Sequence, residues 1–375
     1  MTDSAPTPRH HPGRGYGRTA ALLAAPLALG LTLTACGPSP VDMIEHPMTT
    51  TPSRMAGEEL QRAAEPENSC AAEQSPAEFT GTGDRRVQTM EPGADGVEVP
   101  RSPERILALG VSAVDVACAL GLQDLVVGTS GLPWDADIYL PDSLVDLPEI
   151  DTTASTPTEV ATAARELTPD LIMVADGLDP AAVAALSAVA PTVVYAADAL
   201  SWSAATEMIA DAYGRPRAGG DVLLDVIERV RVTVGAATPP DTRVSLVSVT
   251  GTDGDGAAVQ APDTLGSLML EAVGAGRPPS QRTTDGERIP PLPESPALGD
   301  ELDGDVIFAV VGGAPDAADN ARQVFASDRW ADLDAVGANR MFVVDRAVWE
   351  GAGPVAARAI LEDIRKSING IAPDG

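Results

Sequence analysis

Short apolar runs rich in β-branched residues alternate with alanine-rich stretches of helical period along most of the chain. The apolar runs predict strands at residues 106–109, 125–128, 171–174, 192–195, 244–249, 257–260, 305–311 and 341–344. The intervening and following stretches predict helices at residues 113–120, 156–167, 180–189, 201–213, 262–273, 322–336 and 354–368. Such alternation is typical of an α/β fold with mainly parallel sheets.

Residues 219–235 separate two such α/β halves of the chain. Asp221 is a good N-cap after two glycines, and we expect the helix to end at Gly235, ahead of two prolines. Its apolar residues recur at spacings of three and four and define one face: Leu223, Ile227, Val230 and Val234. The pattern predicts a helix of about 24 Å that joins two lobes. An ordinary surface helix within one larger domain would show the same pattern.

The first 35 residues have the pattern of a bacterial targeting segment. Three arginines precede an apolar stretch at residues 20–33, which is too short to span a membrane comfortably. The stretch ends in Leu33-Thr34-Ala35-Cys36-Gly37, which resembles the lipobox of bacterial lipoproteins. The resemblance implies a signal peptide at residues 1–35, a lipid on the Cys36 sulfur, and an anchor on the outer face of the cell membrane. A signal peptide with a chance cysteine is the alternative.

Residues 36–95 are rich in Pro, Glu, Ala, Ser and Thr and show no sustained apolar period, so they predict a flexible tether. Two further cysteines, Cys70 and Cys118, remain. Because exported proteins fold in an oxidising compartment, we expect these two to form a disulfide that pins the N-terminal arm to the first helix. A buried Cys118 beside a free Cys70 is the alternative.

The chain carries a net charge of −30 and has a pI near 4.2. This charge disfavours nucleic acid and anionic lipid as partners, and it keeps an exported protein soluble. The three histidines, at positions 10, 11 and 46, precede the predicted folded body. Histidine-based catalytic pairs, zinc sites and haem ligation are therefore excluded from that body. Nucleotide-binding glycine motifs are also missing, so we predict a protein that is not an enzyme and holds no resident cofactor.

Seven short segments resemble, in order, the family of substrate-binding proteins that deliver ferric siderophores, haem or vitamin B12 to ABC importers. They are residues 103–109, 119–128, 167–172, 190–194, 330–336, 340–345 and 353–357. Residues 278–282 and the paired cysteines further resemble the siderophore-binding lipoproteins of Gram-positive bacteria. The resemblance implies an N-terminal lobe at residues 96–214, an interlobe helix at residues 215–238 and a C-terminal lobe at residues 239–375. It also implies a ligand cleft between the lobes.

Aromatic residues make up 3% of the chain, so the positions of the tryptophans are informative. Trp134, Trp202 and Trp349 each follow a predicted strand, and open α/β sheets bind ligands at the carboxyl ends of their strands. We predict that one or two of them face the ligand; the alternative is that each packs on its own loop. Ser112, which follows the predicted strand at residues 106–109, is a further candidate for ligand binding.

Arg282 is the predicted cation of the ligand site, with Arg277 and Arg288 in reserve. A guanidinium group pairs bidentately with carboxylate and catecholate oxygens. We expect Arg282 to face Trp134 or Trp202 with the chelate between them; for the two reserve arginines, pairing with nearby acids on the surface is the alternative. Because a ferric siderophore brings its own iron ligands, we expect no metal ligand from the chain.

The family resemblance also implies one acidic residue on each lobe that docks arginines of the permease. Glu159 matches the first position, where a capping-box role competes for the same side chain. The second position falls near Gly276, which is not acidic, and Glu271 is displaced from it by about one helical turn.

Together these observations predict a monomeric, lipid-anchored binding protein outside the cytoplasm that captures a ferric siderophore for an ABC importer. Two alternatives remain. One is a haem-binding protein of the same fold, with Tyr195 as the candidate iron ligand. The other is an envelope interaction protein that has kept the fold and lost transport.

Overall fold

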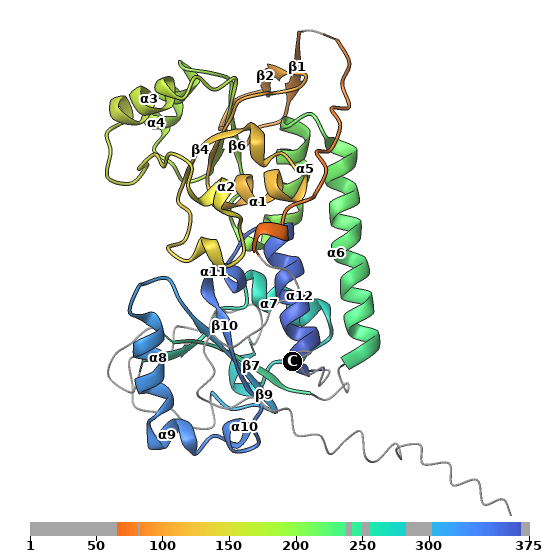
Figure 1. The fold of residues 1–375 in the computed structure, drawn as a ribbon, viewed down its shortest axis with the longest axis vertical. Coiled ribbons are helices and arrows are strands. Elements are labelled where there is room, and N and C mark those ends of the chain that lie inside the picture. The colour runs from red at the N-terminus through yellow and green to blue at the C-terminus, as the bar shows by residue number, and fades with distance from the viewer. Residues whose placement is uncertain (1–65, 82, 238–241, 250–255, 283–301, 369–375) are drawn as a thin grey trace, which may run out of the picture. The chain divides into compact units, whose positions relative to one another are not determined.

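The computed structural model describes residues 66–81, 83–237, 242–249, 256–282 and 302–368 (Figure 1). The predicted signal peptide, Cys36 and Arg288 lie outside these residues. Within them the chain forms two four-stranded sheets, each covered by helices, and one long helix lies between the two in sequence.

The first sheet is entirely parallel and has the order β4-β3-β5-β6. Its strands are β3 (Ile106–Leu109), β4 (Val126–Ser130), β5 (Leu171–Ala175) and β6 (Thr192–Tyr195). All four residues of β3 are buried, as expected of a central strand covered on both faces. We call this sheet and its helices α1–α5 the N-lobe.

The second sheet has the order β10-β9-β7-β8, with β8 antiparallel to β7 and the other pairs parallel. Its strands are β7 (Val244–Val249), β8 (Ala257–Val259), β9 (Val306–Val311) and β10 (Met341–Asp345). We call this sheet and its helices α7–α12 the C-lobe. The prediction of an α/β fold with two mainly parallel sheets is confirmed.

Most helices occupy the predicted intervals with shifts at their ends, while α2 and α11 were not predicted. In the N-lobe they are α1 (Val111–Ala119), α2 (Asp142–Val145), α3 (Pro157–Glu166), α4 (Pro180–Ser187) and α5 (Trp202–Ala212), with 3-10 turns at Pro66–Asn68 (η1), Gln123–Leu125 (η2), Ala136–Ile138 (η3) and Ala199–Ser201 (η4). In the C-lobe they are α7 (Leu265–Ala272), α8 (Ala317–Phe325), α9 (Asp328–Ala331), α10 (Asp334–Gly337), α11 (Arg346–Trp349) and α12 (Pro354–Ile368), with a 3-10 turn at Pro279–Gln281 (η5). The stretch predicted as one helix at residues 322–336 is thus divided among three short helices.

The long helix α6 (Pro216–Ala237) has 22 residues and begins earlier than the sequence pattern predicts. Asp221 lies inside it and is not its N-cap. Instead, the Glu78 side chain accepts from the N–H groups of Arg217 (2.8 Å) and Ala218 (3.0 Å) in the first turn. The helix continues through Gly219. The missing side chain lets α6 approach α5, because a Cβ at this position would lie 2.4 Å from the Cβ of Ala210.

The described part of the N-terminal arm, from Pro66 on, packs on the N-lobe, although residues 36–95 are predicted to be a flexible tether. The predicted disulfide is confirmed: Cys70 is bonded to Cys118 of α1, with their Cα atoms 4.4 Å apart. Backbone hydrogen bonds to Cys118 and Leu120 continue the contact. The antiparallel hairpin of β1 (Asp84–Val87) and β2 (Val97–Pro100) follows.

A single cluster of buried apolar side chains includes residues of both lobes. Ile106 and Leu171 contribute from the N-lobe sheet, and Phe308 and Trp349 from the C-lobe. Helix α12 of the C-lobe contacts α1 of the N-lobe and also α6, while α6 contacts α5 (Figure 1). The two lobes therefore share a core on this side of the molecule.

Asp115 of α1 forms a buried polar contact within that shared core. One of its carboxylate oxygens accepts from the N–H of Val355 at 2.8 Å and the other from the N–H of Ala356 at 3.0 Å, which caps the first turn of α12. Gly353 makes room for the carboxylate, because a Cβ there would lie 2.3 Å from Asp115 Oδ1. Burial raises the pKa of Asp115 to about 6, although the two backbone N–H groups and Arg358 act in the opposite direction.

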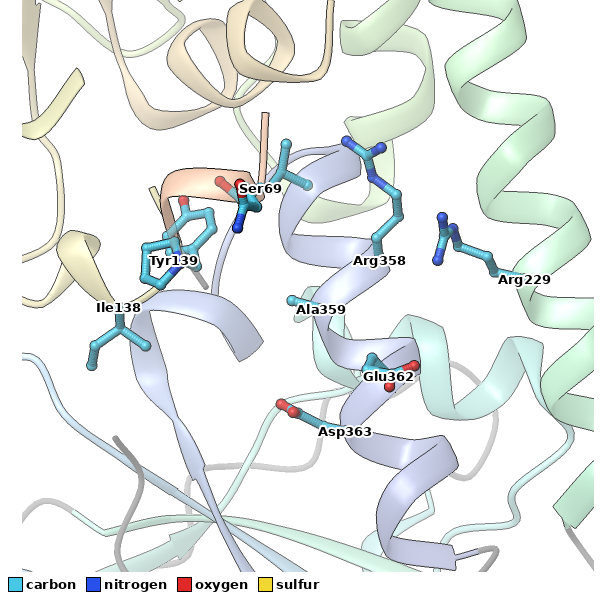
Figure 2. Close-up of a pocket in the computed structure, with 11 residues that line it drawn as sticks. Ser69, Ile138, Tyr139, Arg229, Arg358, Ala359, Glu362 and Asp363 are labelled. Atoms are coloured by element: carbon cyan, nitrogen blue, oxygen red, sulfur yellow. The ribbon is translucent and has the colours of Figure 1, made fainter. Parts of the chain in front are cut away.

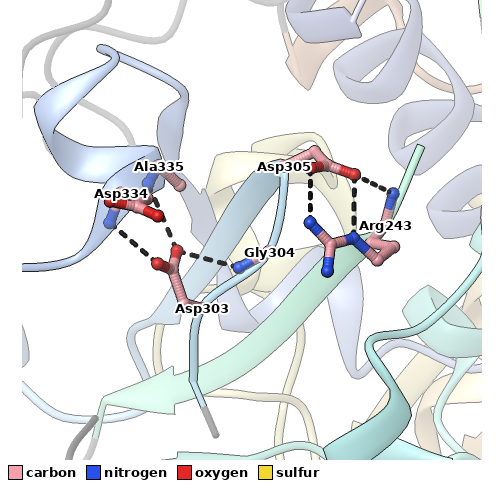
Figure 3. A network of polar contacts seen from close by, with 6 residues as sticks. All are labelled: Arg243, Asp303, Gly304, Asp305, Asp334 and Ala335. Carbon is pink, nitrogen blue, oxygen red and sulfur yellow. Dashed lines mark hydrogen bonds and ion pairs between the residues drawn. The ribbon is translucent and has the colours of Figure 1, made fainter. Parts of the chain in front are cut away.

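Two aspartates organise the amino ends of the C-lobe strands (Figure 3). Arg243 precedes β7 and donates to Asp305, which precedes β9, at 2.8 Å from its backbone N–H and 2.9 Å from Nη2. Asp303 accepts from the N–H groups of Asp334 (2.8 Å) and Ala335 (3.2 Å) and so caps α10. These contacts fix the edge of the sheet that lies away from the carboxyl ends of its strands.

Candidate ligand-binding site

A hollow of about 380 Å³ lies at the carboxyl ends of the N-lobe strands. Its walls are the loops that follow β3 (Leu109, Gly110), β4 (Ser130, Gly131) and β5 (Ala175–Asp179), together with Thr152 and Thr153. Open parallel sheets bind ligands at this edge, because the loops of neighbouring strands diverge there. The hollow is therefore the first candidate for a ligand site.

Gly110 and Tyr195 form the floor of the hollow. Gly110 has a φ of 120°, and a Cβ there would lie 2.3 Å from the Tyr195 hydroxyl, so only glycine fits. Tyr195 is fully buried, its hydroxyl lies 3.4 Å from the carbonyl oxygen of Leu109, and burial raises its pKa. Ser112 has 3% of its surface exposed and is not among the residues that line the hollow. Its predicted ligand contact is therefore corrected, because a buried residue has almost no surface to offer a ligand.

Trp134 lies in the loop after β4 and exposes 69% of its surface. The next residue, Asp135, reaches the C-lobe: its Oδ2 accepts from the N–H of Gly313 at 3.1 Å. Gly312 and Gly313 follow β9, and a Cβ on Gly312 would lie 2.2 Å from Asp135 Oδ2. The carboxyl edges of the two sheets thus meet beside an exposed indole ring.

Arg346 supplies a positive charge at the carboxyl edge of the C-lobe sheet, directly after β10. Its Nη2 donates to the Ser248 hydroxyl, and its Nη1 lies 3.4 Å from a carboxylate oxygen of Glu350. The side chain packs against Gly313, is 24% exposed, and has a buried Nε without a hydrogen-bond partner. Our sequence analysis considered aromatic residues after strands and missed this arginine, although its place after a predicted strand is the same kind of signal.

The lining of the N-lobe hollow contains two carboxylates and no basic side chain. Asp176 accepts from the N–H of Ala197, and Asp179 caps α4 through the N–H of Ala181, both at 2.9 Å. The remaining polar groups are hydroxyls and backbone groups. This surface suits a neutral or positively charged part of a ligand better than an anionic one.

Trp202 and Trp349 lie outside this arrangement. Trp202 is half-buried at the start of α5 and packs against the shared core. Trp349 is fully buried, its indole centroid is 4.7 Å from the ring of Phe308, and its Nε1 donates to Asp363 at 3.0 Å. The structure corrects the prediction for Trp349, because an indole enclosed in the core has no surface to offer a ligand.

Arg282 does not face Trp134 or Trp202 across a shared cavity, which corrects the predicted arrangement. It lines a separate hollow formed only by residues 262–282. Its neighbour Gly276 accepts from the N–H of Val244 at 2.7 Å, at the amino end of β7. Since β7 has six residues, this end is about 20 Å from the carboxyl edge.

The two predicted docking residues are both exposed. Glu159 forms a capping box with Thr156, whose hydroxyl and N–H hold the pKa of Glu159 below its usual value. Glu271 lies on α7 and lines the same hollow as Arg282. The capping role expected of Glu159 is present, and permease docking by either residue stays a prediction.

A further hollow of about 200 Å³ lies between the N-terminal arm, α6 and α12 (Figure 2). Its charged side chains are largely paired: Arg229 donates to Asp225, and Glu362 accepts from Arg365, each at 2.8 Å. The hollow is smaller than the one at the carboxyl ends of the N-lobe strands and is not lined by the strand ends, so we do not assign the main ligand to it.

In the part of the chain that the structure describes, no helix is long and apolar enough to cross a membrane. The same residues contain no group of three or more His, Cys, Asp or Glu side chains placed to hold a metal ion.

Residues 106–348 match the family described as periplasmic binding protein. The chain belongs to the periplasmic binding protein family. Members of this family are substrate-binding proteins and not enzymes. The sequence is 27% identical over 288 residues to a probable siderophore-binding lipoprotein of Bacillus subtilis, YfiY, covering 71% of this chain and 82% of that protein.

Solved structures of the family have the same fold. The crystal structure of Staphylococcus aureus SirA complexed with staphyloferrin B gives a TM-score of 0.59 at 20% identity, covering 76% of this chain and 98% of that chain. Staphylococcus aureus FhuD2 with bound ferrioxamine B gives a TM-score of 0.55 at 19% identity, covering 71% of this chain and 98% of that chain.

Proposed function

We propose that this periplasmic binding protein captures a ferric siderophore outside the cytoplasm and presents it to an ABC importer. The observation that carries the proposal is the hollow at the carboxyl edge of the N-lobe sheet, one wall of which, at Gly131, begins the loop that carries the exposed Trp134. Asp135 and Gly313 bring the edge of the C-lobe sheet, with Arg346, to the same place. In a ferric siderophore the chelator already supplies the iron ligands. The protein therefore has to supply only a flat apolar surface and a few polar anchors.

Relatives of the chain support the same ligand class. YfiY is described as a probable siderophore-binding lipoprotein. SirA and FhuD2, which share the fold, were solved with staphyloferrin B and ferrioxamine B. These ligands belong to those proteins, and they indicate that this fold accommodates ferric siderophores.

The charge of the site favours a neutral ferric hydroxamate over a trianionic ferric catecholate. Asp176 and Asp179 line the N-lobe hollow without a basic neighbour in its walls, and the whole chain carries a charge of −30. An anionic chelate would be repelled by this surface. Arg346 of the C-lobe provides a place for one anionic group of the ligand.

Haem is the weaker candidate for this site. The three tyrosines in the described part of the chain, at positions 139, 195 and 213, are at most 2% exposed. A tyrosine ligand to haem iron would first have to leave the core. No observation favours a scaffold role over transport.

The anchor and the docking contacts complete the proposal. We infer that Cys36 carries a lipid, that Glu159 and Glu271 approach the permease, and that the protein acts as a monomer. Cys36→Ala should release the protein from the membrane fraction. A variant that still partitions into detergent as the wild type does would contradict the anchor.

Tryptophan fluorescence of the purified full chain tests the ligand. We would titrate a ferric trihydroxamate, ferric citrate, a ferric tricatecholate and haemin, and we expect saturable quenching that is strongest for the trihydroxamate. Trp134→Ala should weaken binding about two- to tenfold, because aromatic stacking contributes about 0.5–1.5 kcal/mol beyond the buried area. Trp202→Phe is the matched control and should retain affinity. Absence of binding to every ferric siderophore by calorimetry would refute the proposal.

A further inference from the structure

The hollow that contains Arg282 has a volume of about 390 Å³ and lies wholly on the C-lobe. Its walls come from the start and end of α7 and from the turn that leads into η5. Two of its side chains are arginines, Arg277 and Arg282, and one is a carboxylate, Glu271, which is exposed. Two guanidinium groups in one hollow are notable in a chain with a net charge of −30.

Arg277 is a half-buried cation that forms no ion pair with the residues that the structure describes. Its Nη2 donates to the carbonyl oxygen of Gln260 at 3.0 Å, whereas its Nη1 is buried and has no hydrogen-bond partner among the described residues. Burial lowers the pKa of Arg277 to about 10, and no neighbouring charge acts against this shift. A buried charge is normally paired, because removal from water is unfavourable unless an opposite charge compensates.

Arg282 supplies the exposed half of the pair. Its Nε donates to the carbonyl oxygen of Arg277 at 2.7 Å, which holds the two arginines together. Its Nη2 lies beside Gly276, at van der Waals distance (3.8 Å) from the position of a Cβ there. Neither Nη atom of Arg282 takes part in an ion pair in the described part of the chain, and both remain able to donate to a ligand.

Ser267 adds a hydroxyl to the wall of the hollow. It donates to the carbonyl oxygen of Ala261 at 2.8 Å, and its oxygen lies 3.0 Å from the Thr264 hydroxyl. The hydroxyl is held by these contacts and leaves the two arginines as the charged groups available to an anion.

We propose that this hollow binds a small oxyanion, a phosphate or a carboxylate group, through Arg277 and Arg282. The bound group would neutralise the uncompensated charge of Arg277 and accept hydrogen bonds from the fork of Arg282, which matches oxyanion geometry. The site lies at the amino end of β7, away from the carboxyl-edge hollow, and so constitutes a second binding site. The proposal does not depend on the identity of the ligand at the main site.

Calorimetric titration of the purified full chain with inorganic phosphate, and separately with citrate, tests this site at constant ionic strength. We expect saturable binding of at least one of the two, and the stronger isotherm identifies phosphate or carboxylate as the preferred group. Arg277→Met and Arg282→Ala should each weaken binding at least tenfold, since a charge-assisted contact of about 1.5–3 kcal/mol is lost. Glu271→Gln should strengthen binding, because it removes the one carboxylate that lines the hollow and would repel a bound anion.

Matched controls separate this site from general charge effects and from the main site. Arg231→Gln removes an exposed arginine of α6 and should leave phosphate and citrate binding unchanged. Trp134→Ala should likewise leave it unchanged, whatever its effect on siderophores. Arg277→Met should fold, because replacing an unpaired buried charge with an apolar side chain is not expected to destabilise the chain. The proposal would be overturned if neither anion showed saturable binding, or if Arg277→Met and Arg282→Ala bound the anion with the same affinity as the wild type.

Discussion

Asp115 should make the stability of the protein fall as the pH rises through the mildly acidic range. The carboxylate is fully buried between α1 and α12, and its pKa is raised from 3.8 to about 6. Between these two values the folded state binds more protons at this position than the unfolded state does. The free energy of unfolding therefore decreases with increasing pH in this window.

The size of the effect follows from the shift in pKa. A shift of about two units at about 1.4 kcal/mol each gives roughly 3 kcal/mol of stability that is fully present below pH 4 and lost above pH 6. Asp115→Asn removes the titration and keeps one oxygen that can accept from Val355 or Ala356. All other groups titrate in both proteins, so the difference between them isolates Asp115.

Urea denaturation of the wild type and of Asp115→Asn at intervals from pH 4 to pH 7.5 provides the measurement. We expect the free energy of unfolding of the wild type to fall relative to that of the variant by about 3 kcal/mol over this range. Parallel profiles would show that the pKa of Asp115 is unperturbed. A wild type that gains stability relative to the variant would show that the two N–H groups of α12 outweigh desolvation.

Three further outcomes are expected. Arg346→Gln should weaken a chelate that carries an anionic group about ten- to a hundredfold and affect a neutral one less, as measured by fluorescence titration. Gly110→Ala should lower the free energy of unfolding by about 1–3 kcal/mol, because the new Cβ would clash with the Tyr195 hydroxyl. Gly131 also has a positive φ, but a Cβ there would meet no atom within 4 Å. An equal loss of stability in Gly131→Ala would therefore contradict the clash as the cause. Cys118→Ala should lower stability by up to about 4 kcal/mol, and an unchanged urea midpoint would show that the disulfide does not contribute.

The strands and most helices could be predicted from the sequence because their signals are local. The strand at Ile106–Leu109 and the helix at Pro354–Ile368 have the predicted bounds. The local pattern placed the start of α6 too late, because glycine ordinarily ends a helix, whereas Gly219 packs closely against Ala210 inside it; the family resemblance implied the longer helix at residues 215–238. The hairpin β1–β2 was missed for a related reason: Arg85 and Arg86 interrupt the apolar pattern that identifies a buried strand.

The candidate site was predictable only in part. Trp134 could be proposed because an aromatic residue after a strand is a local signal, and the structure shows it exposed; its ligand contact stays a prediction. The prediction placed Arg282 at the wrong edge of the C-lobe sheet. The position of its loop depends on the pairing of Gly276 with the start of β7, and this tertiary contact leaves no local signal in the sequence. The depth of Trp349 likewise depends on Phe308 and Gly266, which are distant in sequence.

Asp115 and Asp135 each form hydrogen bonds between the lobes, and the difference between these two contacts determines how a ligand can enter. Asp115 holds α12 through two buried hydrogen bonds inside a continuous apolar core, so separating the lobes there would expose that core. Asp135 holds Gly313 through one hydrogen bond in a loop at the edge of the sheets. Opening at this edge breaks this hydrogen bond and the packing of η3 on α11, and it leaves the contact of α1 with α12 in place. The lobes are therefore expected to open at the carboxyl edges of the sheets, with the Asp115 contact as the fixed side, which brings Trp134 and Arg346 to the entering chelate.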